Sequence, residues 1–310
     1  AITNLLAAPI ELPRVKLSAN WMAACGEPGE DADLYATVKA VGLELCPQLG
    51  VSIPVGKDSL SMRTQWKDGD AQKKVVSPVS LIVSSFATLQ DVRGTLTPQL
   101  DAAEEDTTLV LIDLGRGKNR MGGSILGQVL NQAGDEVPDL DDAQDLVRLV
   151  DAVNALRAKG QILAYHDRSD GGLLAAVAEM AFAGHVGVAL NVDMLVTEGD
   201  GIHDSRMDTG DAKNWAQQVG GRRDELTLKA LFSEELGVVL QVRTSERNDV
   251  MQTLRAHGLA PCSHFVGKTR PVSSPIAAGK GELQVWRDAK AIFSAKLEDL
   301  HQVWDAVSWK

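Results

Sequence analysis

The feature that most constrains the fold is an alternation of short apolar runs with amphipathic helical patterns, which begins at residue 108 and continues towards the C-terminus. The apolar runs are rich in β-branched side chains, as buried strands are. The segments between them place apolar residues three and four positions apart, which is the period of a helix. Strands are predicted at 108–113, 161–165 and 236–242, helices at 140–153, 173–182 and 247–256, and a hairpin at 282–294. Such alternation predicts an α/β protein built of packed α+β layers.

A separate group of elements is predicted before residue 101. A helix is expected over 31–45, because acidic residues suit its N-terminus and apolar residues recur on one face. That face is formed by Leu34, Val38, Val41 and Leu45. Runs rich in β-branched residues at 75–76 and 79–87 predict strands.

A polar stretch at residues 101–106 separates these two groups of elements. It predicts a first domain over residues 1–100 and a second domain over residues 101–310, each of a size that supports its own core. Within the second domain, residues 198–224 hold several glycines and many charges but no apolar period. We expect this segment to be an exposed insertion or a disordered loop.

Charge and composition exclude several classes of function. The 310 residues carry a formal net charge of −11, which argues against a nucleic-acid-binding protein with a basic stripe. A single nucleotide remains possible as a ligand, because a local cluster of amides, cations or magnesium is enough to bind it. No apolar run approaches the ~20 residues of a membrane span, so neither nucleic acid nor membrane is an expected partner. The three cysteines lie far apart, which argues against a disulfide framework or a cysteine zinc site and predicts a cytoplasmic setting.

Residues 165–172, with the sequence Tyr-His-Asp-Arg-Ser-Asp-Gly-Gly, lie between a predicted strand and a predicted helix. The end of the strand brings Asp167 and Ser169 to one edge of the sheet, and the helix that follows directs its free amides to the same place. Aspartate oxygens suit magnesium, which shares phosphate oxygens with proteins. A structural interpretation is equally simple: Asp170 caps the helix, and the two glycines form the turn.

Two other segments that contain glycine are weaker candidates. Residues 115–124 follow a strand and open a helix, but they lack the order of a P-loop and the spacing of a dinucleotide fingerprint. A structural turn with a solvated basic rim is favoured there. Residues 55–62 place Lys57, Asp58 and two hydroxyls beside a glycine. This pattern suits a site for a polar ligand and, equally, a turn that forms hydrogen bonds with its own backbone. The histidines lack the spacing of a zinc site.

Four segments occur in an order that is specific when they are taken together. They are KLSANWMAA at 16–24, IPVGKDSLSM at 53–62, AYHDRSDGGL at 164–173 and FSEELG at 232–237. In this combination the chain resembles the large, single-chain type of phosphoribosylformylglycinamidine synthase. The resemblance covers nearly the whole chain and fails only across 198–224.

The resemblance implies a ligase of purine biosynthesis that uses glutamine as its amide donor. Such an enzyme converts formylglycinamide ribonucleotide, ATP and glutamine into formylglycinamidine ribonucleotide, ADP, phosphate and glutamate. Its synthetase region has two similar halves, each with two domains that resemble those of aminoimidazole ribonucleotide synthetase. By resemblance, this chain is the later part of the second half: the end of a first domain, truncated at its start, and then the second domain. That half holds an auxiliary nucleotide, ATP or ADP, with Mg²⁺, and the nucleotide is regarded as structural.

The resemblance also implies roles for three residues. Asn4 resembles the asparagine that ligates magnesium in the helix motif G-E-x-x-x-N, whose glutamate would fall just before Ala1. Asp167 resembles the aspartate ligand in H-D-x-S, and Ser169 resembles the serine that contacts the nucleotide. No catalytic residue is assigned, because the family's catalytic histidine lies in the first half and its nucleophilic cysteine lies in a glutaminase domain. These remaining parts of the same polypeptide are the expected partners, and the piece alone is expected to be inactive.

Two alternatives stand beside this interpretation. One is a related enzyme, either aminoimidazole ribonucleotide synthetase itself or the short multi-subunit synthase; residues 57–62 and 304–310 favour the large type instead. The other is a stand-alone nucleotide-binding or scaffold module of the same fold. Both ends of the sequence look cut, since it opens as if within an apolar helix, and this disfavours a stand-alone module.

Overall fold

The computed structural model describes residues 1–104, 106–196, 212–271 and 280–308, and of residues 212–220 it describes the backbone alone. The chain divides into two compact units. Unit 1 consists of residues 1–94 and 142–150, and unit 2 consists of residues 95–141 and 151–310.

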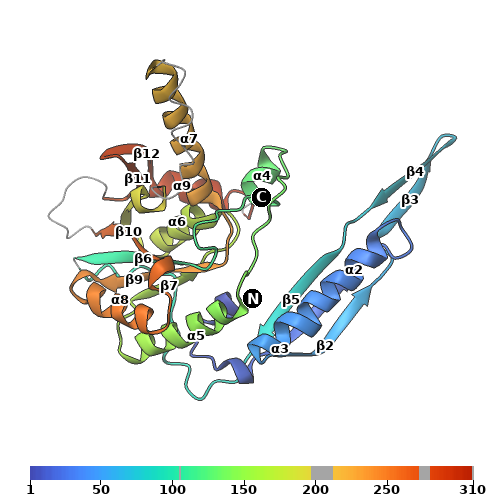
Figure 1. The fold of residues 1–310 in the computed structure, drawn as a ribbon, viewed down its shortest axis with the longest axis horizontal. Helices are drawn as coiled ribbons and strands as arrows, with labels where there is room; N and C mark the ends of the chain where they lie inside the picture. Colours follow the sequence, from blue (N-terminus) through green and yellow to red (C-terminus); the bar gives the residue numbers. More distant parts are fainter. Residues whose placement is uncertain (105, 197–211, 272–279, 309–310) are drawn as a thin grey trace. The chain divides into compact units, whose positions relative to one another are not determined.

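Unit 1 is built on a three-stranded sheet in the order β2–β1–β5. β1 (Lys16–Met22) pairs in parallel with β2 (Ser52–Ser59) and antiparallel with β5 (Ser80–Phe86). Two parallel neighbours need a crossover connection, and a helical run between β1 and β2 supplies it. The run comprises α2 (Glu30–Val38), a π-helical stretch (Lys39–Leu45) and α3 (Cys46–Leu49). Figure 1 shows it lying along the three strands.

The helix predicted at 31–45 is confirmed, and its two ends have local causes. Three acidic residues in the first turn of α2 favour the positive end of the helix dipole. The run stops where Gly50 adopts a left-handed conformation, with φ of 67°. The strands predicted before residue 88 are also present, as β4 (Ala71–Val76) and β5. β4 pairs with β3 (Arg63–Asp68) in a hairpin, and unit 1 begins with the short helix α1 (Ile2–Leu5).

Residues 55–62 do not form the turn that the sequence allowed, because β2 continues through them to Ser59. Gly56 lies opposite Ala19 of β1, and a Cβ atom on Gly56 would lie 2.5 Å from the Ala19 carbonyl oxygen. Glycine is therefore what permits the two strands to approach here. Lys57 and Asp58 are exposed residues of a strand, and the Lys57 Nζ atom donates to Ser59 Oγ at 3.2 Å.

Unit 2 contains a seven-stranded sheet in which every neighbouring pair of described strands is antiparallel except β8 and β11. In spatial order the strands are β12 (Lys290–Lys296), β11 (Glu282–Arg287), β8 (Gly187–Asn191), β10 (Ser263–Arg270), β6 (Thr107–Asp113), β9 (Gly237–Arg243) and β7 (Ala164–Asp167). β6 is buried along its whole length, which accounts for its continuous apolar sequence.

One face of this sheet carries the main core of unit 2. Leu109 and Leu111 of β6 pack there with Leu173 and Val177 of α6 (Gly172–Gly184), together with apolar residues from the ends of two other helices. Those helices are α7 (Ala212–Phe232) and α9 (Leu297–Asp305). Because side chains alternate along a strand, Thr108 points to the opposite face, the face of α8 (Arg247–Ala256). The remaining helices are α4 (Ile125–Val129) and α5 (Ala143–Ala158). None of the described helices is both long and apolar enough to cross a bilayer.

The predicted elements of unit 2 are largely confirmed, with shifts at their ends. The helix predicted at 247–256 coincides with α8, and the predicted hairpin is β11 with β12. The strand predicted at 161–165 instead begins at Ala164 as β7. β7 starts late because its hydrogen bonds to β9 begin only at the Leu163 amide, which donates to the Gln241 carbonyl oxygen.

The segment 198–224 was predicted to be an exposed insertion or a disordered loop. Residues 197–211 lie outside the described residues, but the backbone is helical from Ala212 onward as part of α7. The prediction of a disordered loop is therefore wrong for residues 212–224, whereas the exposed insertion stays a prediction. Gly220 and Gly221 interrupt the apolar period, whereas the residues around them are mostly strong helix formers such as alanine, lysine, glutamine and arginine. In α7, the helix propensity of the residues determines the structure although the apolar residues do not recur with a helical period.

Candidate functional site at one edge of the seven-stranded sheet

Three of the sequence motifs meet at one edge of the sheet in unit 2. β6 and β7 both end at this edge, and β9, which lies between them, begins there. The pairing register places Asp113 opposite Gly237 and Asp167 opposite Val238. The loop after β6, the loop after β7 and the segment before β9 are therefore neighbours, although they are far apart in the sequence.

A buried ion pair fixes the loop that follows β7. Arg168 and Asp113 expose 1% and 4% of their side chains, and an Nη atom of Arg168 donates to Asp113 Oδ1. Arg168 Nε also donates to the Glu235 carbonyl oxygen at 2.5 Å. Asp113 accepts from the amides of Gly115 at 3.1 Å and Gly117 at 2.7 Å. The pair thus joins all three segments, and its charges are compensated inside the protein.

A second buried pair fixes the loop that follows β6. Glu235 is fully buried, and the Arg120 guanidinium donates to its Oε1 atom from Nε at 2.6 Å and to its Oε2 atom at 2.9 Å. This is the two-pronged geometry that makes arginine–carboxylate pairs strong. Arg120 also lies 3.4 Å from Asp141, and Lys118 lies 3.0 Å from the same residue. The interpretation of 115–124 as a structural turn fits these contacts, and Arg116 and Lys118 are exposed as the predicted solvated rim requires, whereas Arg120 is largely buried in its ion pair.

The carboxylate of Glu234 joins the N-terminal ends of two helices. Its Oε1 atom accepts from the amide of Ile125 in α4 and from the amide of Gly171, the residue before α6, at 2.9 Å each. The expected cap from Asp170 is absent. The N-cap residue of α6 is Gly171, and α6 has no side-chain capping hydrogen bond there. Glu234 occupies one of the first amides of this helix, and the direction of the others towards a ligand stays a prediction.

His166 connects β7 to α6 and the C-terminal helix. Its Nδ1 atom is hydrogen-bonded to the Asp167 carbonyl oxygen at 2.6 Å, and its Nε2 atom to Glu179 Oε2 at 2.8 Å. Trp304 Nε1 donates to the other oxygen of Glu179 at 2.9 Å. Burial alone would lower the pKa of His166, but two acceptors and the nearby carboxylates raise that pKa above its ordinary value. The same hydrogen bond to His166 holds the pKa of Glu179 below its ordinary value.

The structure divides the residues that resemble a magnesium–nucleotide site between the two units. Asp167 ends β7 with 15% of its side chain exposed, and Ser169 is exposed in the loop that follows. Asn4 lies in α1 of unit 1. No group of three histidine, cysteine, aspartate or glutamate side chains suited to a metal occurs among the described residues. A magnesium ion shared by Asn4 and Asp167 stays a prediction.

Sequence reasoning missed the residues that hold this edge together. Asp113, at the end of a strand, and Glu235, in the segment before β9, are both buried and charged. A signal was present, because a charged residue that adjoins a fully apolar strand is seldom left without a partner. The identity of each partner depended on contacts between residues more than fifty positions apart.

Two parts of the chain match known protein families. Residues 105–277 match the family described as AIR synthase related protein, C-terminal domain. The chain belongs to the AIR synthase-related family. Residues 1–88 match the FGAR-AT PurM_N-like domain, so the two AIR synthase-like domains follow one another as the resemblance implied. The expected α/β fold of this family is confirmed.

Solved structures agree on the fold. PurLQS from Thermotoga maritima aligns with a TM-score of 0.58 at 11% identity, covering 96% of this chain and 39% of that chain. T. maritima PurL complexed with ATP aligns with a TM-score of 0.57 at 12% identity, with the same coverage. Escherichia coli HypE aligns with a TM-score of 0.57 at 20% identity, covering 95% of this chain and 75% of that chain. This AIR synthase-related chain therefore spans about two fifths of the length of the PurL proteins it resembles.

Proposed function

We propose that this chain is part of a phosphoribosylformylglycinamidine synthase, the ATP- and glutamine-dependent carbon–nitrogen ligase of purine biosynthesis. The observation that carries the proposal is the meeting of two of the four family segments, 164–173 and 232–237, at one sheet edge, where Asp167 ends β7 and Ser169 is exposed in the loop that follows. The match of residues 1–88 to an FGAR-AT domain supports the same assignment. On this proposal, the first synthetase half and the glutaminase domain belong to the remainder of the same polypeptide.

The chemistry of the donor residues fits an auxiliary site for Mg²⁺ and ADP or ATP. Asp167 offers a carboxylate and Asn4 a side-chain carbonyl, which are the hard oxygen donors that magnesium prefers. Ser169 offers an exposed hydroxyl for the nucleotide. When bound, the metal would neutralise phosphate charge. The part of unit 2 is to hold the Asp167 carboxylate and the Ser169 hydroxyl at the end of β7, which the Arg168–Asp113 pair keeps in place.

The first test is turnover by the chain alone. We expect no formylglycinamidine ribonucleotide from formylglycinamide ribonucleotide, ATP and either glutamine or ammonia, and no glutaminase activity. The reason is that the catalytic groups would lie in the remainder of the polypeptide. Turnover above trace by the purified chain would contradict the proposal.

The second test separates a structural nucleotide from a reacting one. In the full-length enzyme, Asp167→Asn keeps the shape of the side chain but removes the charge that faces magnesium. We expect less bound ADP and a lower melting temperature, because a ligand bound only to the native state stabilises it by a few kcal/mol when binding is tight. Turnover per folded molecule should be largely retained. Asp170→Asn, an exposed aspartate of the same loop, is the matched control and should keep the nucleotide.

The outcome that would contradict this assignment is also defined. If Asp167→Asn melted like the wild type and kept its ADP but lost turnover by about 100-fold or more, Asp167 would belong to the reaction itself. A loss of that size corresponds to about 2.7 kcal/mol of transition-state stabilisation.

A second candidate function is a stand-alone nucleotide-binding or scaffold module of the same fold. The likeness to HypE favours it, because this chain covers 75% of that protein but only 39% of the PurL proteins. Binding of Mg–ADP by the chain alone discriminates between the two. A part of a larger enzyme should bind weakly, whereas a sub-micromolar dissociation constant, about −8 kcal/mol or stronger, would favour the stand-alone module.

A further inference from the structure

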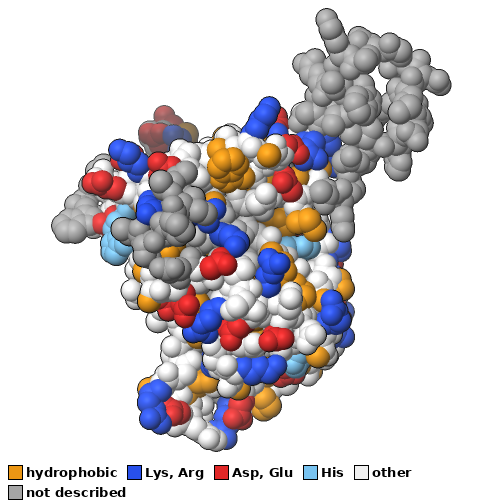
Figure 2. Space-filling view, turned by 90° about the vertical axis from the view of Figure 1, so that its left-hand side faces the viewer, with side chains coloured by type: hydrophobic (Ala, Val, Ile, Leu, Met, Phe, Trp, Pro, Cys, Tyr) orange, Lys and Arg blue, Asp and Glu red, His pale blue; other side chains and the backbone are white. Residues whose placement is uncertain are grey.

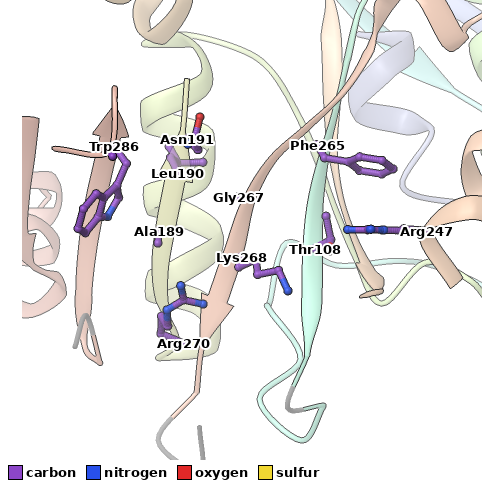
Figure 3. A pocket seen from close by; sticks show the side chains of 11 residues that line it. Thr108, Ala189, Leu190, Asn191, Arg247, Phe265, Gly267, Lys268, Arg270 and Trp286 are labelled. Carbon is purple, nitrogen blue, oxygen red and sulfur yellow. The ribbon is translucent and has the colours of Figure 1, made fainter. Parts of the chain in front are cut away.

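A hollow of about 340 Å³ lies on the face of the unit 2 sheet that carries α8. Its floor is made of small residues on neighbouring strands, Ala189 of β8 and Gly267 of β10. A Cβ atom on Gly267 would lie 2.9 Å from the Ala189 carbonyl oxygen, so a side chain there would disturb the sheet. That Cβ atom would also lie 3.1 Å from a side-chain carbon of Leu190, which packs in the core, so the glycine here permits the close approach of the two strands. Figure 3 shows the residues around the hollow.

Two aromatic side chains stand on opposite sides of this floor (Figure 3). Trp286 of β11 is partly buried, and its indole nitrogen donates to Gln284 Oε1 at 3.2 Å, which fixes the ring. Phe265 of β10 is also partly buried, and the Arg247 guanidinium lies 5.8 Å from the centre of its ring. An aromatic ring held at the margin of such a floor is a surface on which a planar ligand stacks.

Three cations also line the hollow: Arg247, Lys268 and Arg270. The Lys268 charge is compensated by Asp106 at 2.8 Å. Within the part of the chain that the structure describes, neither Arg247 nor Arg270 has a carboxylate within ion-pair distance. Arg270 donates to the neighbouring Thr269 carbonyl oxygen at 3.2 Å.

One acidic residue beside the hollow is already paired with cations that do not line it. Asp288, next to the lining residue Ala289, lies 2.7 Å from Arg223 and 3.5 Å from Arg287. Among the described residues, Arg247 shares the single carboxylate of Asp106 with Lys268 at longer range, and Arg270 has none at ion-pair distance, so the lining cations leave the hollow locally positive in a chain whose net charge is −11. Arginines without a carboxylate partner, beside an open hollow, are suited to phosphate.

We propose that this hollow binds a small phosphorylated aromatic ligand of the class of a nucleoside monophosphate. The ring stacks on Trp286, and the arginines hold the phosphate. The volume is within the range of small-molecule pockets. A nucleic-acid strand is disfavoured by the net charge, and Figure 2 shows acidic and basic side chains interspersed over the described part of one face. This binding function is additional to the proposed function and does not depend on it.

Calorimetry on the whole chain at low salt, with EDTA present, tests the proposal. The probes are AMP, adenosine and inorganic phosphate. We expect AMP to bind at least about tenfold more tightly than either of the other two, because only AMP has both the ring and the anion. EDTA removes divalent metal, so any binding observed does not use a magnesium site. This separates the result from any failure of the proposed function, which concerns a magnesium-dependent site.

Substitutions locate the binding. Arg270→Glu and Trp286→Ala should each weaken AMP binding by about tenfold or more, while Trp286→Phe should retain most of it. Arg255→Ala is the matched control, because Arg255 is an exposed arginine of α8 that does not line the hollow. If Trp286→Ala failed to fold, as judged by its melting curve, Arg270→Glu and Arg247→Glu would still decide the question at the surface.

Three results obtained with AMP would overturn the proposal. They are no AMP binding at millimolar concentration, AMP binding that is unaffected by Arg270→Glu, and binding that Arg255→Ala weakens equally. A single-stranded ten-nucleotide RNA that binds at least about tenfold more tightly than AMP would show that the hollow serves nucleic acid instead, and the proposal would then be wrong.

Discussion

Replacing Arg168 by methionine should destabilise unit 2 far more than a surface charge substitution does. The side chain is almost entirely buried and donates to the Asp113 carboxylate, to the Glu235 carbonyl oxygen and, at 3.4 Å, to the Leu236 carbonyl oxygen. Methionine fills a similar length but carries no donor. The Asp113 carboxylate would stay buried with its two amide hydrogen bonds and no counter-charge.

The expected magnitude follows from the loss of one partner of a buried ion pair. Removing one partner costs about 3–5 kcal/mol, because the remaining charge is left uncompensated in the protein interior. For a unit of this size, 1 kcal/mol corresponds to about 2–4 °C in the melting temperature, so a decrease of about 6–20 °C is expected. The double variant Asp113→Asn/Arg168→Met should be less destabilised than the sum of its single variants, since it buries no charge.

Thermal unfolding followed by circular dichroism, with urea unfolding as a second measure, tests this expectation. Arg222→Met is the control, because Arg222 pairs with Glu225 at 3.0 Å while 38% of its side chain is exposed. That variant should change the free energy of unfolding by less than about 1 kcal/mol. If Arg168→Met melted within about 2 °C of the wild type, or if the two single effects simply added, the buried pair would not hold this sheet edge together.

Two further predictions follow from particular contacts. Gly56→Ala should destabilise unit 1 by at least about 1 kcal/mol in urea unfolding, because the new Cβ atom would lie 2.5 Å from the Ala19 carbonyl oxygen and force the strands apart. Glu179→Gln should lower the pKa of His166 measured by NMR. The substitution should also flatten the dependence of stability on pH. The raised His166 pKa gives stability that is fully present below pH ~6.5, and this stability is lost as the pH rises through the folded-state pKa of His166. The lowered pKa of Glu179 adds stability above pH ~4.5 that is lost as the pH falls through its folded-state pKa, so the pair stabilises most between these values.

Each of these two predictions has a matched control. Gly42→Ala places its Cβ atom in open space within a helical stretch and should be neutral or stabilising. If it destabilised as much as Gly56→Ala, close strand approach would not be the cause. Glu298→Gln changes an exposed carboxylate of α9 and should leave the His166 titration unmoved. An unchanged His166 pKa in Glu179→Gln would contradict the assigned hydrogen bond.

Local patterns were sufficient to predict elements whose burial is either continuous or follows a simple period. β6 is buried throughout, so its sequence is apolar throughout, and its predicted bounds differ by one residue from those observed. α8 has one buried face and one solvated face, and its predicted bounds coincide with the structure. α7 was missed because glycines and charges hide its period, although most of its residues favour helix.

The candidate site was predicted only as separate loops. The end of β7 was correctly interpreted as bringing Asp167 and Ser169 to a sheet edge, because strand ends are visible in the sequence. That β9 lies between β6 and β7 depends on antiparallel pairing across more than one hundred residues, and no local period encodes it. The partners Arg120 and Glu235 follow from that topology, so they were not predictable from spacing.

The strand β12 stands at the end of the sheet order, and no described strand pairs with its outer side. An edge of this kind invites a second copy of the chain to add its own strand. If two copies paired antiparallel about Phe293, Lys290 of one copy would face Lys296 of the other at both ends of the new ladder, because the two positions are equally far from the centre. Like charges directly opposite each other destabilise a strand pair. The middle of β12 exposes Ile292 and Phe293 to solvent, which favours contact with another apolar strand. The lysines at the two ends of β12 oppose self-association in this register.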